Sequence, residues 1–226
     1  MVPIFPTLMK RALPVPSPKH ILSALTALSL AGCASDEVIE DGGVVVTRSA
    51  CPAVAIPAST GDVTLFDPPS SRDARAIDIV AYVTNVRSQC SDNGGFITTT
   101  ATFDVHAQRR NASGTRQVVL PTFTTVIQGG TSIVAKRTSR VALNFTDGQL
   151  RASTSSASTT RVSQSATTLP EAVRRKLTRR RKSGDVDAAV DPMTDPEVRA
   201  AVSRASFEML VGFQLTPEQL AYNATR

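Results

Sequence analysis

The chain has few residues of the kinds that build sugar and metal sites. Tryptophan is absent, and the 226 residues include two tyrosines, eight phenylalanines and two histidines. Carbohydrate platforms usually stack a sugar ring on tryptophan or tyrosine, so a site of that kind is disfavoured. Any core must be built mainly from valine, isoleucine, leucine, alanine and phenylalanine.

Signatures of the common enzyme classes are also missing. His106 is the one histidine after residue 20, and a lone histidine cannot form a multi-histidine zinc site. The sequence has no G-x-S-x-G elbow, no P-loop and no G-x-G-x-x-G fingerprint. His106 falls between Asp104 and Gln108 on the polar face of a predicted strand, so we expect it to face solvent. No catalytic residue, cofactor or metal is therefore predicted.

Hydrophobic runs are short. The longest near the N-terminus, residues 21–30, is about half the roughly twenty residues that cross a bilayer as a helix. Lys10, Arg11 and Lys19 precede this run and small residues follow it, an order typical of a secretory leader. A buried apolar helix is the alternative, and the prolines at 14, 16 and 18 disfavour it. A start at Met9 would give the more usual opening Met-Lys-Arg, so residues 1–8 are expected to be an over-extended start.

Leu30-Ala31-Gly32-Cys33 resembles the lipobox of bacterial lipoproteins. The resemblance implies that residues 1–32 are a signal peptide and that Cys33 is acylated and becomes the mature N-terminus. Residues 33–49 would then be a tether, and residues 50–226 the folded domain. Ala34 and Ser35, rather than aspartate, follow the cysteine, which implies a lipid anchor in the outer membrane facing the periplasm. Removal of the leader lowers the formal net charge from +6 to +3.

Three further stretches are similar to uncharacterised proteobacterial envelope lipoproteins. They are Cys51-Pro52, the Leu120-Pro121-Thr122-Phe123 stretch and the tail at residues 210–223. The likeness covers most of the mature chain, and it carries no activity and no catalytic residue.

Cys51 and Cys90 are the two cysteines that lipidation would leave. An even pair in an oxidising compartment predicts one disulfide. The alternative is a metal or redox pair, which needs the thiols close in sequence or joined by histidine, and neither condition holds.

The middle of the chain predicts β-structure. Residues 96–108 alternate, with Ile97, Ala101 and Phe103 on one face and threonines on the other, the pattern of a half-buried antiparallel strand. Residues 61–66 and 77–86 read as further strands, residues 88–95 as a linker with a turn, and Pro121 as a break in pairing or an edge. Residues 153–168 predict an exposed edge strand or a loop. We therefore expect a mainly β fold, an immunoglobulin-like antiparallel β-sandwich.

Helical segments follow residue 170. Residues 171–181 predict a helix that Gly184 ends, and Asp195-Pro196-Glu197 predicts the start of a second helix to about residue 205. Residues 207–215 alternate as a last strand, and Thr216 caps a short C-terminal helix. The sandwich thus carries a helical insertion at about 170–205, before its last strand.

Seven cations within nine residues mark this insertion: Arg174, Arg175, Lys176, Arg179, Arg180, Arg181 and Lys182. On a helix they would spread around much of the circumference and favour an anionic partner. In the envelope this predicts anionic lipid, lipopolysaccharide, peptidoglycan or an acidic protein, and not nucleic acid. The alternative is a solvated insertion that the neighbouring aspartates and Glu197 neutralise.

Two hypotheses follow for function. The first is a membrane-anchored envelope lipoprotein that acts as a non-enzymatic structural or interaction module. The second is an enzyme or enzyme subunit that uses Asp185 and Asp187, although an exposed pair beside seven cations would stay ionised. Asp191 and Asp195 extend this acidic run, but a calcium loop would need spacing that is missing.

Overall fold

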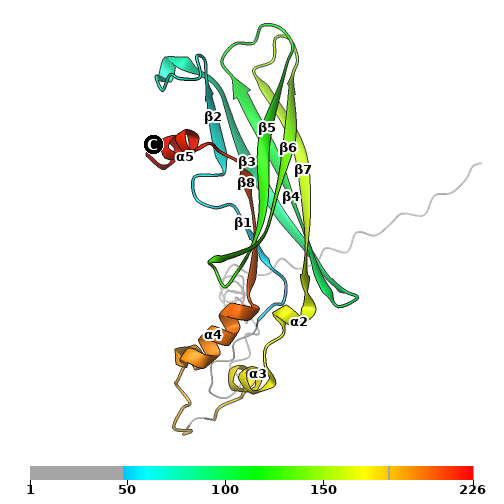
Figure 1. Cartoon of the computed structure of the whole chain (residues 1–226), viewed down its shortest axis with the longest axis vertical. Coiled ribbons are helices and arrows are strands. Elements are labelled where there is room, and N and C mark those ends of the chain that lie inside the picture. Colours follow the sequence, from blue (N-terminus) through cyan, green and yellow to red (C-terminus); the bar gives the residue numbers. More distant parts are fainter. Residues whose placement is uncertain (1–47, 183, 226) are drawn as a thin grey trace, which may run out of the picture. The chain divides into compact units, whose positions relative to one another are not determined.

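Two four-stranded sheets lie face to face in a sandwich-like arrangement (Figure 1). The computed structural model describes residues 48–182 and 184–225, all within one compact unit, Gly42–Arg226. The first sheet has the order β1 (Ala53–Ala55), β8 (Phe207–Phe213), β5 (Arg116–Gln128) and β6 (Ser132–Phe145). The second has the order β2 (Asp62–Phe66), β3 (Ile77–Asn93), β4 (Phe96–Arg109) and β7 (Arg151–Ser163).

Pairing is antiparallel throughout the described strands except between β1 and β8, which run parallel. The predicted mainly β sandwich is confirmed at this level. The predicted signal peptide, Cys33, a possible strand at 44–46 and most of the tether lie outside the described residues.

The core fills the space between the sheets. On β4 the predicted inward side chains are buried, with Phe103 and Val105 exposed by 4% and 0%. The other sheet contributes the largest fully buried side chains, among them Leu143, Phe145 and Phe213. The period-two pattern of residues 96–108 therefore predicted the buried face of β4 correctly.

Strand β3 is longer than the sequence predicts. Residues 88–95 are not a linker, because β3 continues to Asn93 and only Gly94 and Gly95, with φ of 60° and 79°, form the turn. A register shift between Thr84 and Arg87 interrupts the alternation, with Asn85 in the left-handed region at φ 52°. Beyond this bulge the strand is exposed and polar, so it carries no hydrophobic pattern.

Pro121 lies inside a continuous central strand, so the predicted break or edge is wrong. Strand β5 runs through it and pairs with β6 and β8. The Pro121 carbonyl accepts a hydrogen bond from Gln214 N at 2.9 Å, next to Thr122↔Phe213, where pairing with β8 ends. In an antiparallel strand the N–H and C=O of one residue point the same way. The missing donor therefore faces Gln214, one residue past the end of β8, and removes only the last bond of this pairing.

The edge strands are also continuous. Residues 132–136 and 139–145 form one strand, β6, not two. The Ser/Thr-rich segment is an edge strand, β7, as predicted, but it ends at Ser163 and a short helix, α2 (Gln164–Thr167), follows.

The helical insertion is confirmed and has a small core of its own. Helix α3 (Glu171–Thr178) contributes Val173 and Leu177, and α4 (Pro196–Ala205) contributes Val198 and Ala201. Two 3-10 turns occur, η2 (Ala74–Ala76) and η3 (Pro192–Thr194).

The last helix, α5 (Pro217–Thr225), is three residues longer than predicted. The Asn223 amide fixes it to the sandwich by donating to the carbonyls of Ser59 and Asp62, at 2.9 and 2.8 Å. None of the described helices has the length and apolar character that a membrane crossing requires.

Cys51 and Cys90 form a disulfide, as the sequence predicts. It joins the segment before β1 to the exposed half of β3, with Cα atoms 6.1 Å apart. The start of the domain is therefore covalently held to the second sheet.

Candidate functional site

The basic run is only partly helical. Arg174, Arg175 and Lys176 lie on α3, but the helix ends at Thr178 instead of continuing to residue 181. Arg179 already has extended backbone, with φ −62° and ψ 119°. A longer helix would extend its apolar stripe, Val173 and Leu177, to positions that the sequence fills with arginine. The prediction that Gly184 ends the helix is wrong for this reason.

Most of these cations have acidic partners within the insertion. Lys176 Nζ lies 2.9 Å from Asp195 Oδ2, and Arg179 Nη2 lies 3.1 Å from Asp187 Oδ1. Arg174 pairs with Glu171 one turn earlier on α3. The hydrogen bond between Lys176 and Asp195 raises the pKa of the lysine and lowers the pKa of the aspartate. The carboxylates of the insertion therefore neutralise most of its positive charge, as the alternative of a solvated, neutralised insertion predicts.

Arg181 lies inside the insertion, with 6% of its side chain exposed. Its Nε is 3.3 Å from Asp187 Oδ2, and its Nη1 is buried with no hydrogen-bond partner among the described residues. An anion outside the protein does not reach this guanidinium. Arg181 thus contributes to the interior of the insertion and not to an exposed surface.

Arg175 and Lys182 remain on the surface. Both are exposed, and neither side chain makes an ion pair in the described part of the chain. Arg180 is also exposed, but it has an interaction partner. The accessible positive charge of the insertion is therefore smaller than its seven cations indicate.

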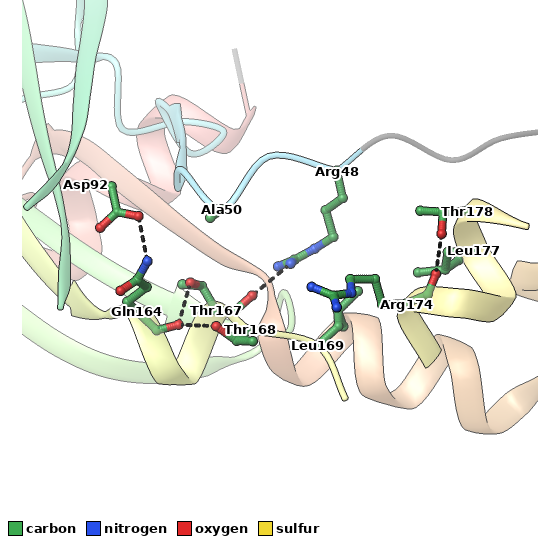
Figure 2. A pocket seen from close by; sticks show the side chains of 10 residues that line it. All are labelled: Arg48, Ala50, Asp92, Gln164, Thr167, Thr168, Leu169, Arg174, Leu177 and Thr178. Atoms are coloured by element: carbon green, nitrogen blue, oxygen red, sulfur yellow. Dashed lines mark hydrogen bonds between the residues drawn. The ribbon is translucent and has the colours of Figure 1, made fainter. Parts of the chain in front are cut away.

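A pocket lies where the insertion meets the sandwich (Figure 2). Its volume is about 390 Å³. It is lined by Arg48, Ala50, Asp92, Gln164, Thr167, Thr168, Leu169, Arg174, Leu177 and Thr178. The sequence signals that could have found it are weak, because these residues come from four separate segments.

Arg48 forms one wall of this pocket and connects several elements. Its guanidinium donates to the Thr167 carbonyl at 3.0 Å, to the Ala205 carbonyl and to Ser206 Oγ at 3.4 Å (Figure 2 shows the first). Burial lowers the pKa of Arg48. These bonds satisfy carbonyls at the ends of α2 and α4, where a helix leaves its last acceptors unpaired. Arg48 therefore fixes the entering chain to the insertion.

The rest of the pocket wall is mixed in character. Gln164 Nε2 donates to Asp92 Oδ2 at 2.7 Å, while Leu169 and Leu177 supply apolar surface. The lining holds one carboxylate, Asp92, and neither histidine nor cysteine. Both arginines are already engaged, Arg48 by carbonyls and Arg174 by Glu171. This arrangement can accept a small amphipathic group but presents no nucleophile paired with a base.

The aspartates of the insertion act as caps and ion-pair partners. Asp191 and Asp195 accept backbone N–H bonds from Met193 and Glu197 at 2.8 and 2.9 Å. The two candidate enzyme carboxylates, Asp185 and Asp187, face arginines. Across residues 48–182 and 184–225, no three histidine, cysteine or acidic side chains are grouped to hold a metal.

His106 lies on the outer face of β4, as predicted, and stacks on Tyr82 with ring centroids 5.6 Å apart. Neighbouring Asp104 accepts hydrogen bonds from Ser155 and Asn85, which lower its pKa. These polar residues form a regular outer surface of the second sheet.

A second pocket, of about 570 Å³, was not anticipated from the sequence. It lies between β2 and α5, where Phe66 and Tyr222 meet edge to face at 5.2 Å and Arg72 lies over the Phe66 ring. Arg116 and Asp78 form a two-pronged ion pair at its rim, at 2.9 and 2.7 Å. The paired charges leave no excess of either sign to select a ligand.

Comparisons with protein-family models, with curated proteins and with solved structures gave no match to this chain. No activity or ligand is therefore carried over from a matching protein.

Proposed function

We propose that this chain is an exported cell-envelope lipoprotein, acylated on Cys33, whose β-sandwich acts as a non-enzymatic interaction module. The observation that carries the proposal is the Cys51–Cys90 disulfide, eighteen residues after the lipobox cysteine. Disulfides persist in oxidising compartments such as the periplasm and are rare in the cytosol. The sequence pattern before Cys33 and the bond after it thus agree on the same compartment.

The distance between the anchor and the fold suits a tethered domain. Arg48 follows Cys33 by fifteen positions in the chain. A chain of this length spans at most about 50 Å when fully extended. Arg48 then holds the chain against α2 and α4, so a membrane-anchored domain would stay close to the lipid surface.

The insertion offers the contact surface of this module. Arg175 and Lys182 are the exposed cations of the basic run that make no ion pair with a described residue, and the partly neutralised remainder of the run flanks them. An anionic envelope component, such as lipid headgroups, lipopolysaccharide, peptidoglycan or an acidic protein, complements this charge. Because surface charges act weakly and are screened by salt, we expect the contact to be salt-sensitive.

Replacement of the acylated residue tests the anchor. In a bacterial host that processes lipoproteins, we expect the native chain in the outer-membrane fraction and the Cys33→Ser variant outside it. Mass spectrometry should find acyl chains on Cys33. The matched control is Cys51→Ser with Cys90→Ser, which should leave fractionation unchanged. Full precursor with its leader intact in the cytosol, and no acylation, would overturn the proposal.

Charge reversal tests the surface. We expect Arg175→Glu to weaken binding to anionic vesicles or peptidoglycan at low salt, because it replaces attraction by repulsion. Arg110→Glu is the matched control, since Arg110 is also exposed and lies outside the insertion. If both variants bind equally, the insertion is not the contact surface. The proposal that Cys33 carries a lipid anchor would not be affected by this result.

We also propose that the sandwich is immunoglobulin-like. Three features support this finer class: two sheets that are antiparallel except between β1 and β8, a chain that crosses repeatedly between them, and a core between their inner faces. Superposition of an experimental structure on immunoglobulin domains tests it, and a better fit to another sandwich class would contradict it.

A further inference from the structure

One side of the sandwich is an open seam between two edge strands. β6 and β7 each end the order of their sheets, and they run side by side (Figure 1). Toward the start of β6 and the end of β7 a groove of about 340 Å³ opens between them. It is lined by Thr124, Val126, Ala135, Lys136, Arg137, Ser158, Thr159, Thr160 and Arg161.

The first part of β6 has an unpaired edge. Within the described chain β6 pairs with β5 alone, so the backbone groups on its other edge have no strand partner. Residues 132–140 are exposed on both faces, and Ile133 and Val134 are 67% and 50% exposed. A strand with free backbone donors and acceptors is a template for adding another strand.

Positive charge surrounds this seam. Lys136, Arg137 and Arg161 line the groove, no carboxylate lines it, and none of the three makes an ion pair with a described residue. From residue 132 to 163 the sequence holds five cations and one acid, Asp147. Within the described residues these five cations make no ion pair, unlike Lys176, Arg179 and Arg181 of the insertion.

The two cations of β6 that line the groove, Lys136 and Arg137, lie on opposite faces of the strand. Arg137 pairs with Thr124 on β5, and Thr124 Oγ1 donates to Ser158 Oγ on β7 at 2.8 Å. Directly opposed side chains share a face, so Arg137 points toward the other sheet. Lys136 lies on the opposite face, with Nζ 5.7 Å from the centroid of the Phe123 ring. Both faces of an added strand would therefore meet positive charge.

We propose that an acidic peptide segment in extended conformation binds along the free edge of β6. The backbone would supply the ladder hydrogen bonds, two adjacent acidic side chains, one on each face of the added strand, would meet Lys136 and Arg137, and two adjacent apolar side chains would cover Ile133 and Val134. A phosphate group would satisfy the charge but not a row of backbone groups, so the edge favours a peptide over a lipid headgroup.

Edge cations also discourage pairing between copies of the chain, because like charges would face each other. The same charges attract a strand of opposite sign, so specificity and protection from self-association have one cause. The inference is independent of the lipid anchor and of the insertion surface.

Fluorescence anisotropy with the purified full chain tests it, using a labelled synthetic peptide in which pairs of valines alternate with pairs of glutamates, so that both faces of the strand carry carboxylates. We expect saturable binding, and weaker binding of the same peptide with alternate amides N-methylated, which keeps the charge but removes backbone donors. The double variant Lys136→Glu/Arg137→Glu should lose affinity by about tenfold or more, since two attractions become repulsions.

Arg75→Glu/Arg110→Glu is the matched control, because it changes net charge equally at two exposed cations outside both the seam and the insertion; it should bind the acidic peptide as the native chain does. Circular dichroism checks that both double variants stay folded, and Arg137→Gln, which removes one charge, should show an intermediate loss. The inference is overturned if the acidic peptide does not bind at millimolar concentration, or if the N-methylated peptide binds equally well. It is also overturned if the peptide does not bind but anionic vesicles do, and the Lys136→Glu/Arg137→Glu variant abolishes the vesicle binding.

Discussion

The guanidinium of Arg109 lies over the ring of Phe145, with Cζ 5.2 Å from the ring centroid. Both residues end a strand, Arg109 on β4 and Phe145 on β6, and both are about 2% exposed. The guanidinium donates to main-chain carbonyls of Gln149 and Gly114 at 2.8 Å and of Thr146 at 2.9 Å, among others. One buried side chain thus joins two loops, each of which connects one sheet to the other.

Replacement of Arg109 by methionine should destabilise the domain by about 3 kcal/mol, because several charge-assisted hydrogen bonds are lost together. Urea denaturation measures the change. The control is Arg110→Met at the exposed neighbouring residue, which should stay near the native value. A loss below about 1 kcal/mol for Arg109→Met would show that water replaces the guanidinium at little cost.

The disulfide should stabilise the fold by about 3–4 kcal/mol, because it closes a loop between residues 39 apart and so restricts the unfolded chain. We expect a reducing agent to lower the urea midpoint of the native chain. The Cys51→Ser/Cys90→Ser variant should have the lower midpoint already and should not respond to the reducing agent. Identical midpoints for all four conditions would contradict this prediction.

The contact between α3 and α4 should depend on pH only at its extremes. The folded pKa of Asp195 lies below its ordinary value of 3.8, so its contribution is present above that pH and is lost as the pH falls through the folded pKa. The folded pKa of Lys176 lies above 10.5, so its contribution is present below that pH and is lost as the pH rises through the folded pKa.

An NMR titration of the Glu197 amide follows this contact, because that amide donates to Asp195 Oδ1 at 2.9 Å. We expect Asp195→Asn to abolish its response to acid, and Asp191→Asn, at the cap of η3, to leave it in place. An Asp195 carboxyl that titrates at or above 3.8 in the folded chain would contradict the assignment.

Gly212 on β8 should not tolerate a side chain. A Cβ there would lie 2.6 Å from Thr60 Oγ1 and 3.0 Å from the Thr60 carbonyl oxygen. That carbonyl already accepts a hydrogen bond from Phe213 N at 2.8 Å. We expect Gly212→Ala to lower the free energy of unfolding by about 1–3 kcal/mol, as overpacked cores do. Adding Thr60→Gly removes the hydroxyl but not the carbonyl, so it should restore part of the lost free energy of unfolding. If it restores none, the Thr60 side chain is not the cause of the destabilisation.

The sequence predicts the sandwich well where one face of a strand is buried. Phe96–Arg109 shows this, because each inward residue of the strand packs against the other sheet. Prediction fails in the second half of β3, where an exposed strand needs no hydrophobic pattern. Pro121 was predicted as a break or an edge because the sequence does not show where pairing with β8 ends. Its missing donor falls at that end.

The candidate site was predictable in composition but not in geometry. The basic run is evident in the sequence, but the burial of Arg181 against Asp187 depends on where α3 ends. The β6–β7 seam joins two strands that are both unremarkable alone, and only sheet order makes them neighbours. Long-range pairing of this kind has no local signal.

The parallel pair of β1 and β8 has a consequence for biogenesis. Ala53–Ala55 pairs with residues 208–210, which come 155 positions later in the chain. β8 also covers the inner edge of β5, so the first sheet stays two strands short until β8 has been synthesised. A nascent polypeptide that cannot complete its fold early remains threadable, which is what passage through a translocation pore demands.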